Sequence, residues 1–486
     1  MSKHNSLLEL FTDIADAIRE KTGDTGTIPA VEFPDMIRDR LQIAPPKPYL
    51  TFKSPSSFTL KVNDATKHWD GTLEYSTDTS AWITWDGTTT LSSATSGSDN
   101  VLYLRGTGNT VITGSNASYK WVFTGSDIAC IGNIENLLDY VTVESGAHPT
   151  MASYCYYYMF RDCTSLTKAP ALPATMLVYC CYYGMFYGCT GLTQAPALPA
   201  TTLEDSCYNY MFKNCTGLTK APALPATTLA NSCYSNMFQG CTGLTQAPAL
   251  PATTLANNCY YYMFQYCSSL TQTPALPATT LTTYCYYGMF YGCTGLTKAP
   301  ALPATTLTNY CYTGMFLGCA SLTQAPVLPA TTLANSCYYN MFRDCTSLAQ
   351  APALPATMLA ERCYYYMFYG CTGLTQAPAL PATTLANNCY GFMFRDCTSL
   401  TQAPALPATT LAESCYHSMF HGCISLKLSS TQTGEYTVEY RIPTTGTGTT
   451  AMSALTDMFI STGGTFAGTP EINTTYYLSN TNTVVG

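Results

Sequence analysis

Cysteine is the residue whose spacing in this chain most directly suggests chemistry. Of the 24 cysteines, 22 fall into two columns that lie eight residues apart and recur every 26 residues, starting with Cys155 and Cys163. Such columns could form disulfides, bind zinc or pack as small apolar side chains. Zinc is disfavoured because the columns offer no CxxC pairs with histidines at ligand spacing. The pattern favours buried thiols in a packed core, with a disulfide inside each copy as the alternative.

Acid–base catalysis would need carboxylates or histidines, and these are scattered through the repeated region. The carboxylates there are predicted to be exposed and form no converging pair: Asp162, Glu204, Asp205, Asp344, Glu361, Asp396 and Glu413. General acid–base catalysis needs such groups desolvated and aimed at one point, and a polysaccharide hydrolase needs two carboxylates across a cleft. His417 and His421 lie four residues apart but have no third metal ligand in view. We therefore expect no catalytic residues, no metal, no cofactor and no enzymatic activity.

Tyrosine is the residue type that favours binding. Tyrosines recur at variable positions of the repeated unit, where they would form a belt of rigid amphipathic rings able to stack on sugars or proteins. The candidate ligand-binding residues are Tyr157, Tyr158, Tyr183, Tyr210, Tyr261, Tyr262, Tyr287, Tyr339, Tyr365, Tyr366 and Phe392. Alternatively, these rings pack against each other between neighbouring copies and only support the fold.

The cysteines and tyrosines belong to one 26-residue unit that is written eleven times between Ala152 and Ser425. We count positions in each copy from its first cysteine, which is position 0. Positions 0, 1, 4, 5 and 8 never change and hold Cys, Tyr, Met, Phe and Cys. They form one stripe on a helix of about 3.6 residues per turn. We therefore expect a helix that turns this stripe inward and exposes the variable positions 2, 3, 6 and 7.

A strand is expected after the second cysteine of each copy. Leu166, Ala169 and Ala171 fit the spacing of inward residues in a leucine-rich-repeat strand. Pro170 recurs in the middle of this segment and removes one backbone donor from the ladder between copies. The strands must therefore be short. A period this strict predicts a solenoid in which each unit buries its apolar side against its neighbours.

The regions outside the repeats have different patterns. Residues 1–47 show helical spacing and are predicted to form a helical attachment or oligomerisation segment. Residues 48–143 contain short β-branched or aromatic runs separated by turn residues, which predicts a β-sandwich whose core holds the four tryptophans. The solenoid is assigned to residues 144–428. In residues 429–486, Met458-Phe459 followed by Thr462 in place of a cysteine indicates a degenerate last repeat that caps the stack.

Composition limits the partners of the chain. Its formal charge is −8 with 10% charged residues and no basic run, so we expect no nucleic-acid partner. No stretch approaches the roughly 18 apolar residues of a membrane-spanning helix, so no membrane insertion is expected. The first residues lack the pattern of a signal peptide, which predicts synthesis in a cytoplasm.

Two resemblances carry these patterns further. The block Met159-Phe160 with Cys163-Thr164-Ser165-Leu166 resembles the BspA-like, or Treponema-type, leucine-rich repeats of bacterial surface proteins. The Ala-Pro-Ala strand departs from that family and puts the strand length in doubt. Separately, residues 10–23 with Phe33-Pro34 look like a segment common at the start of tail and other virion proteins of phages that infect gut bacteria. Neither resemblance supplies catalytic residues.

Together these features predict a multidomain protein: a small helical segment, an immunoglobulin-like β-sandwich, and an α/β leucine-rich-repeat solenoid of eleven repeats with a degenerate C-terminal cap. The resemblances imply a non-enzymatic phage virion protein, such as a tail fibre, receptor-binding or decoration protein. It would be made in the bacterial cytoplasm, be homo-oligomeric, attach to other virion proteins through residues 1–47, and bind a host-surface protein or glycan. A BspA-like bacterial surface adhesin is the first alternative, and a polysaccharide-depolymerising tail spike is the second.

Overall fold

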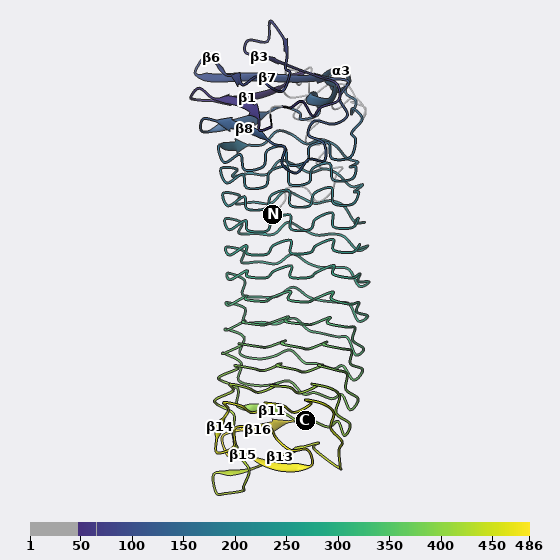
Figure 1. The fold of residues 1–486 in the computed structure, drawn as a ribbon, viewed down its shortest axis with the longest axis vertical. Coiled ribbons are helices and arrows are strands. Elements are labelled where there is room, and N and C mark those ends of the chain that lie inside the picture. The colour runs from purple at the N-terminus through teal and green to yellow at the C-terminus, as the bar shows by residue number, and fades with distance from the viewer. Residues whose placement is uncertain (1–46, 65) are drawn as a thin grey trace, which may run out of the picture. The chain divides into compact units, whose positions relative to one another are not determined.

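The computed structural model describes residues 47–64 and 66–486. The predicted helical segment 1–47 lies outside the described residues except for Lys47. Residues Tyr49–Gly486 form one compact unit. Within this unit, successive turns of the chain stack as parallel coils between β-strands near its start and a small sheet near its end (Figure 1).

Two sheets form the region before the repeats. The first contains β1 (Leu50–Ser54), β3 (Thr72–Ser76), β4 (Ile83–Thr84), β6 (Ala94–Ser96), β7 (Asp99–Thr107) and β9 (Ile128–Ile131). The second contains β2 (Thr59–Val62), β5 (Leu91–Ser92) and β8 (Trp121–Thr124). Three of the four tryptophans, Trp69, Trp85 and Trp121, are buried as predicted. The prediction is wrong for Trp82, which is half-buried and has the Arg105 guanidinium 4.1 Å from its ring centroid. The strand orders β9-β1-β7-β3-β4 and β5-β2-β8 do not confirm an immunoglobulin-like topology.

This sheet region continues directly into the repeats. The single helix in the described residues, α3 (Asn136–Glu144), packs on β7, and β10 (Leu166–Lys168) of the first repeat pairs in parallel with β9. Backbone N–H groups of Ile112 and Trp121 donate to the carbonyl oxygens of Cys155 and Met159, at 2.9 and 2.8 Å. In later repeats the same two carbonyls accept from the preceding coil. The sheet region therefore supplies the hydrogen-bond donors that a preceding coil would supply to the first repeat.

The predicted helix in each repeat is wrong, and with it the α/β class. Throughout residues 152–425, all of which are described, the segment around the cysteines is a series of turns. Even positions close the turns, because each N–H donates to the carbonyl three residues earlier, as Met159 does to Tyr156. Odd positions link the coils, because each N–H donates to the next coil, as Phe160 does to Met185 at 2.9 Å.

The turn series requires an unusual backbone at every fourth residue. Positions −1, 3 and 7 have positive φ in every repeat, for example +62° at Tyr154, +52° at Tyr158 and +60° at Asp162. Glycine, asparagine and aspartate tolerate this left-handed region best, and position 7 holds one of them in almost every copy. A spacing of four is close to 3.6, so the inward stripe resembled one face of a helix. The stripe itself is confirmed, since positions 0, 1, 4, 5 and 8 are buried in every repeat.

The strand segment of each repeat is very short. Apart from β10 and β11 (Gln402–Pro404), neighbouring coils are joined there by single parallel bridges such as Gln246↔Gln272. A second series of bridges, such as Thr306↔Thr332, joins the coils in the return segment that follows. The prolines explain this, because they remove the donors that would extend the ladder. Leu166 is buried as predicted, but Ala171 is exposed and Ala169 only half-buried. Pro170 and Leu172 point inward instead.

The C-terminal region continues the stack and then covers it. Phe459 stacks on Phe420 with ring centroids 5.6 Å apart, and the N–H of Phe420 donates to the carbonyl of Met458, which agrees with a degenerate last repeat. A four-stranded sheet follows, in the order β13 (Tyr436–Ile442), β15 (Thr474–Ser479), β12 (Lys427–Ser429) and β14 (Gly463–Gly464). The last strand, β16 (Thr483–Val485), pairs with β11. Along the described chain, no helix has the length and apolarity to span a bilayer.

Candidate functional site

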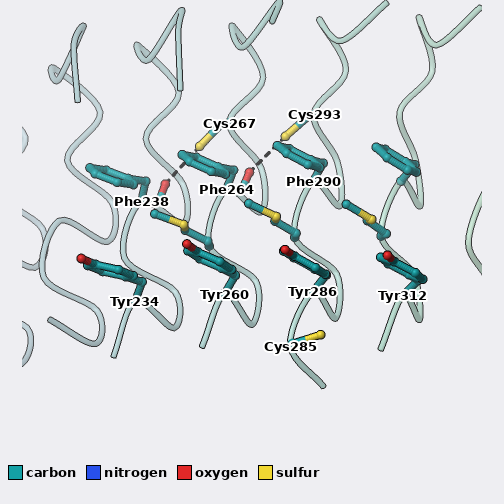
Figure 2. Close-up of a cluster of buried hydrophobic side chains, with 14 of the residues drawn as sticks. Tyr234, Phe238, Tyr260, Phe264, Cys267, Cys285, Tyr286, Phe290, Cys293 and Tyr312 are labelled. Atoms are coloured by element: carbon teal, nitrogen blue, oxygen red, sulfur yellow. Dashed lines mark hydrogen bonds between the residues drawn. The ribbon is translucent and has the colours of Figure 1, made fainter. Parts of the chain in front are cut away.

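The interior of the stack consists of columns of identical side chains. Position-1 tyrosines stack from coil to coil, as in Tyr234–Tyr260 with centroids 6.0 Å apart and planes 10° apart. Position-5 phenylalanines do the same, as in Phe238–Phe264 at 5.6 Å and 4° (Figure 2). Such columns keep the coils in register, because a one-residue slip would separate every pair of rings at once.

The cysteine columns lie beside these rings and are reduced. All 24 cysteines are free and buried, so the disulfide alternative is not realised in this structure. From Cys189 onward, each position-8 thiol donates to the carbonyl oxygen of the phenylalanine in the preceding coil, as in Cys293 Sγ to Phe264 O at 3.0 Å (Figure 2). In the first repeat, Cys163 Sγ donates to the carbonyl oxygen of Trp121 instead, at 3.2 Å. In the described residues no group of three or more histidine, cysteine, aspartate and glutamate side chains is placed to hold a metal ion.

Outside this core, the variable positions carry the predicted tyrosines, which we call the tyrosine face. All eleven candidate residues named from the sequence are half-buried. They are not fully exposed on a helix, because the turn series places positions 2 and 3 side by side and lets their rings contact the next coil. Tyr157 lies 4.8 Å from Tyr158 and 4.9 Å from Tyr183, centroid to centroid.

The tyrosine face is divided into three groups. The first runs from Tyr157 to Tyr210, where Tyr183 and Tyr210 are 5.4 Å apart. The second joins Tyr261, Tyr262 and Tyr287 at 4.5 to 5.2 Å. The third joins Tyr339, Tyr365, Tyr366 and Phe392 at 4.5 to 6.1 Å. The rings therefore support each other within groups, as the packing alternative predicts, and part of each ring stays exposed.

Small polar residues interrupt the tyrosine face between the groups. Ser235 and Asn236 stand between the first and second groups, are both buried, and are hydrogen-bonded to each other at 2.8 Å. Thr313 and Gly314 stand between the second and third groups, where a hollow of about 510 Å³ opens. A second hollow, of about 560 Å³, lies in the first group beside Arg161 and Lys213.

Burial keeps several hydroxyls of the tyrosine face protonated at neutral pH by raising their pKa values. Burial is the largest cause that raises the pKa of Tyr158, to about 12, and it also raises the pKa values of Tyr157, Tyr210 and Tyr261. These groups therefore present neutral hydroxyls that can donate and accept hydrogen bonds. Cations lie over some rings, such as Arg161 over Tyr158 at 5.0 Å and Lys213 over Tyr210 at 4.9 Å.

Sequence reasoning missed part of this surface. Tyr284 and Tyr310, at position −1, stack on each other at 4.8 Å and border the 510 Å³ hollow. Arg362 borders it too. Position −1 was overlooked because a helix starting at the cysteine would leave it outside. The available signal was the recurrence of glycine, asparagine, aspartate and serine at every fourth residue.

Comparison with known proteins supports the repeat assignment. A family model described as "BspA type Leucine rich repeat region (6 copies)" matches residues 140–271, 207–349 and 314–440, which together cover more than half of the chain. No curated protein matches the chain. Among solved structures, a leucine-rich repeat protein from Bacteroides ovatus aligns at 16% identity over 57% of this chain and 80% of that chain, with a TM-score of 0.22. From the family match we conclude that this repeat-rich chain of turns, bridges and short strands belongs to the BspA-type leucine-rich repeat family.

Proposed function

We propose that this protein is a non-enzymatic, adhesin-type binding protein that uses the tyrosine face to hold a protein or glycan of another surface. The observation that carries the proposal is the division of one side of the stack into three groups of half-buried rings. Rings held on a regular backbone lose little entropy on binding, and tyrosines supply both apolar contact and hydroxyls. Three groups on one rod also allow several weak contacts to act together.

The opposite side of the repeats is a poorer candidate. It presents a monotonous column of lysine and glutamine, for example Gln246, Gln272 and Lys298, which the sequence changes little from copy to copy. Its backbone is joined by parallel bridges at these residues. A repetitive polar ladder of this kind maintains the stack, whereas the tyrosine face differs in almost every repeat. Specificity is therefore assigned to the tyrosine face.

The full-length chain allows a direct test. Tyr157→Ser, Tyr261→Ser and Tyr365→Ser together remove one ring from each group, and Gln194→Ser, Gln246→Ser and Gln272→Ser make the matched change on the opposite side. We expect wild-type protein and the glutamine variant to bind mucin-coated surfaces or intact bacterial cells, measured by flow cytometry or surface plasmon resonance. The tyrosine variant should lose roughly ten-fold or more in affinity. Equal binding by all three proteins would refute the proposal.

The narrower prediction of a phage virion protein rests on residues 10–23 and Phe33-Pro34. We keep it as a separate proposal, in which residues 1–47 attach homo-oligomers to a particle and the repeats face the host. Immunogold labelling of intact particles with antibody against the repeats would test it. Gold on purified particles would support the virion role, and gold confined to the surface of bacteria would favour the bacterial adhesin.

A further inference from the structure

The hollow at Thr313 is a gap in an otherwise stacked series of rings. Position 2 holds tyrosine in the two coils before it, at Tyr261 and Tyr287, whose rings stack with centroids 5.0 Å apart. It holds tyrosine again in the two coils after it, at Tyr339 and Tyr365, whose rings stack at 5.6 Å. Thr313 stands where the intervening ring would be. Tyr287 and Tyr339 are therefore separated by two coils, which leaves room for one flat ring between them.

The neighbouring Gly314 has no side chain, and no tyrosine ring of the preceding coil lies over it. At Gly184 and Gly288, the same position in other repeats, an added Cβ would lie 2.2 Å from the ring of Tyr158 or Tyr262, so a tyrosine covers those glycines. At Gly314 an added Cβ would meet nothing closer than 4.0 Å, at Leu317. The preceding coil has Gly288 instead of a tyrosine at this position, so no ring reaches over Gly314.

The other interruption of the tyrosine face is closed by its own side chains. Ser235 and Asn236 are each 4% exposed and Thr313 is 3% exposed, so the two interruptions differ in their side chains and not in their burial. The Asn236 amide donates to the Ser235 hydroxyl, and the Ser235 hydroxyl reaches the carbonyl oxygen of Tyr261 at 3.4 Å. Two polar side chains therefore hydrogen-bond to each other at this interruption. At the other interruption, Thr313 lines the hollow and Gly314 has no side chain that could fill it.

Most residues that border the hollow carry a hydroxyl group. Thr313 donates its hydroxyl proton to the carbonyl oxygen of Ser336 at 2.5 Å, which fixes the floor and leaves the Thr313 oxygen as an acceptor. Six tyrosines form most of the remaining border, and exposed Arg362 lines the hollow too. Among the residues that the structure describes, Arg362 forms an ion pair only with Glu361, at 3.6 Å and with both side chains about half exposed, which is a weak interaction in water. Its guanidinium can therefore bind a ligand.

We propose that this hollow binds one pyranose ring of an oligosaccharide, stacked between the second and third groups of the tyrosine face. The C–H face of a sugar ring packs on aromatic rings, and its hydroxyls match the hydroxyls of the hollow. Arg362 would donate to sugar hydroxyls or to the carboxylate of an acidic sugar. A wholly apolar side chain of a protein partner would leave these polar groups unpaired. The inference rests on the proposed function and names the ligand class for one part of the same face.

Thr313→Tyr is the sharpest test, because it fills the gap with a residue that the coils on both sides already carry. Full-length wild type, Thr313→Tyr and Ser235→Tyr are applied to an array of neutral, uronic-acid and sialic-acid oligosaccharides. We expect wild type and Ser235→Tyr to retain the same sugars, and Thr313→Tyr to lose roughly ten-fold or more. Circular dichroism and thermal unfolding check that each variant folds. Retention of no sugar by wild type, or equal retention by Thr313→Tyr, would overturn the proposal.

Arg362→Gln provides a second test that does not alter the interior. Its matched control is Lys298→Gln, which removes one positive charge from the opposite side and installs the residue found there in other repeats. A loss with Arg362→Gln confined to acidic sugars assigns the guanidinium to a carboxylate, and an equal loss on neutral sugars assigns it to hydroxyls. Unchanged retention would overturn the role of Arg362. If cells still bind through the tyrosines while the array stays blank, this inference fails and the proposed function stands.

Discussion

The thiol of Cys267 donates a hydrogen bond to the carbonyl oxygen of Phe238, 3.1 Å away in the preceding coil (Figure 2). The same carbonyl also accepts the N–H of Cys241, which closes its own turn. One oxygen therefore joins the local turn to the next coil. This relationship recurs through the repeats and explains why position 8 holds a side chain that is both small and able to donate.

Replacing a position-8 cysteine should lower the free energy of unfolding more than replacing a position-0 cysteine. Cys267→Ala loses packing and the hydrogen bond, whereas Cys285→Ala, at a fully buried position 0, loses mainly packing. We expect both to lower the free energy of unfolding, with Cys267→Ala lower by a further 0.5–1 kcal/mol or so. Urea unfolding of the two variants under reducing conditions measures the difference. Equal losses would show that the thiol acts only by its volume.

The buried thiols should make the protein sensitive to alkali. Burial raises the pKa of Cys181, Cys233 and Cys241 to about 12, from an ordinary value of 9.0. Above pH 9.0 the unfolded chain loses these protons while the folded chain keeps them, so their stabilising contribution is complete below that pH and is lost as the pH rises towards 12. Each thiol contributes a slope of about 1.4 kcal/mol per pH unit in that window.

Circular dichroism and thiol labelling, followed together across pH in reducing buffer, check this expectation. The cysteines should resist alkylation near neutral pH and become reactive in one step as the fold is lost. Gradual labelling without loss of structure would contradict it, because that would require thiolates inside the folded core. A urea-unfolded sample provides the control for full labelling.

The turn series reverses the usual effect of replacing glycine by alanine. Gly318 has φ of +69°, and an added Cβ would make only ordinary contacts, the nearest being Gly292 Cα and Tyr291 Cε2 at 3.8 Å. Backbone strain alone should therefore make Gly318→Ala destabilising by about 1 kcal/mol. In a helix the same substitution would stabilise by about 1 kcal/mol. Thermal or urea unfolding gives the sign, and Gly318→Asn, which matches Asn214 at this position, should be the milder change.

Whole repeats should be removable. Deletion of residues 233–258 removes one whole unit and joins Ser232 to Cys259. Every odd-position N–H then still lies opposite a carbonyl of the next coil. We therefore expect a cooperative fold with a slightly lower free energy of unfolding. Deletion of residues 233–245 removes half a unit and puts the aromatic columns out of register. That variant should lose cooperative unfolding. Differential scanning calorimetry compares the two, and a cooperative transition in the half-unit variant would refute the role assigned to register.

The sequence was most informative where an invariant residue repeats at a fixed interval. Burial of Cys155, Tyr156, Met159, Phe160 and Cys163 followed from their constancy, and so did the stacking of one unit on the next. The helix did not follow, because these positions fit a period of 3.6 and a series of four-residue turns equally well over so short a stretch. Only backbone preference separates the two, and Gly188 and Asn214 at a positive-φ position carried that signal.

The candidate site was predictable in its residue type but not in its shape. Tyrosines at positions 2 and 3 identified the side of the coil on which the half-buried rings group. The hollow required knowing that Thr313 lies between Tyr287 and Tyr339, which are 52 residues apart in sequence. It also required knowing that no ring from the preceding coil lies over Gly314, because that coil has Gly288 at the same position. Such relationships join side chains of different coils, so one copy read by itself does not contain them.

Coils that offer the same donors on one side and the same acceptors on the other make the length of the stack adjustable. Trp121 at one end and the sheet of β12 to β15 at the other end limit growth, but the backbone hydrogen bonds at positions 1, 3, 5 and 7 are the same at every interior junction. Gain or loss of whole units would shift the tyrosine groups along the stack by fixed increments. Under the proposed function, gene duplication would thus tune the spacing of contacts to the spacing of targets on another surface.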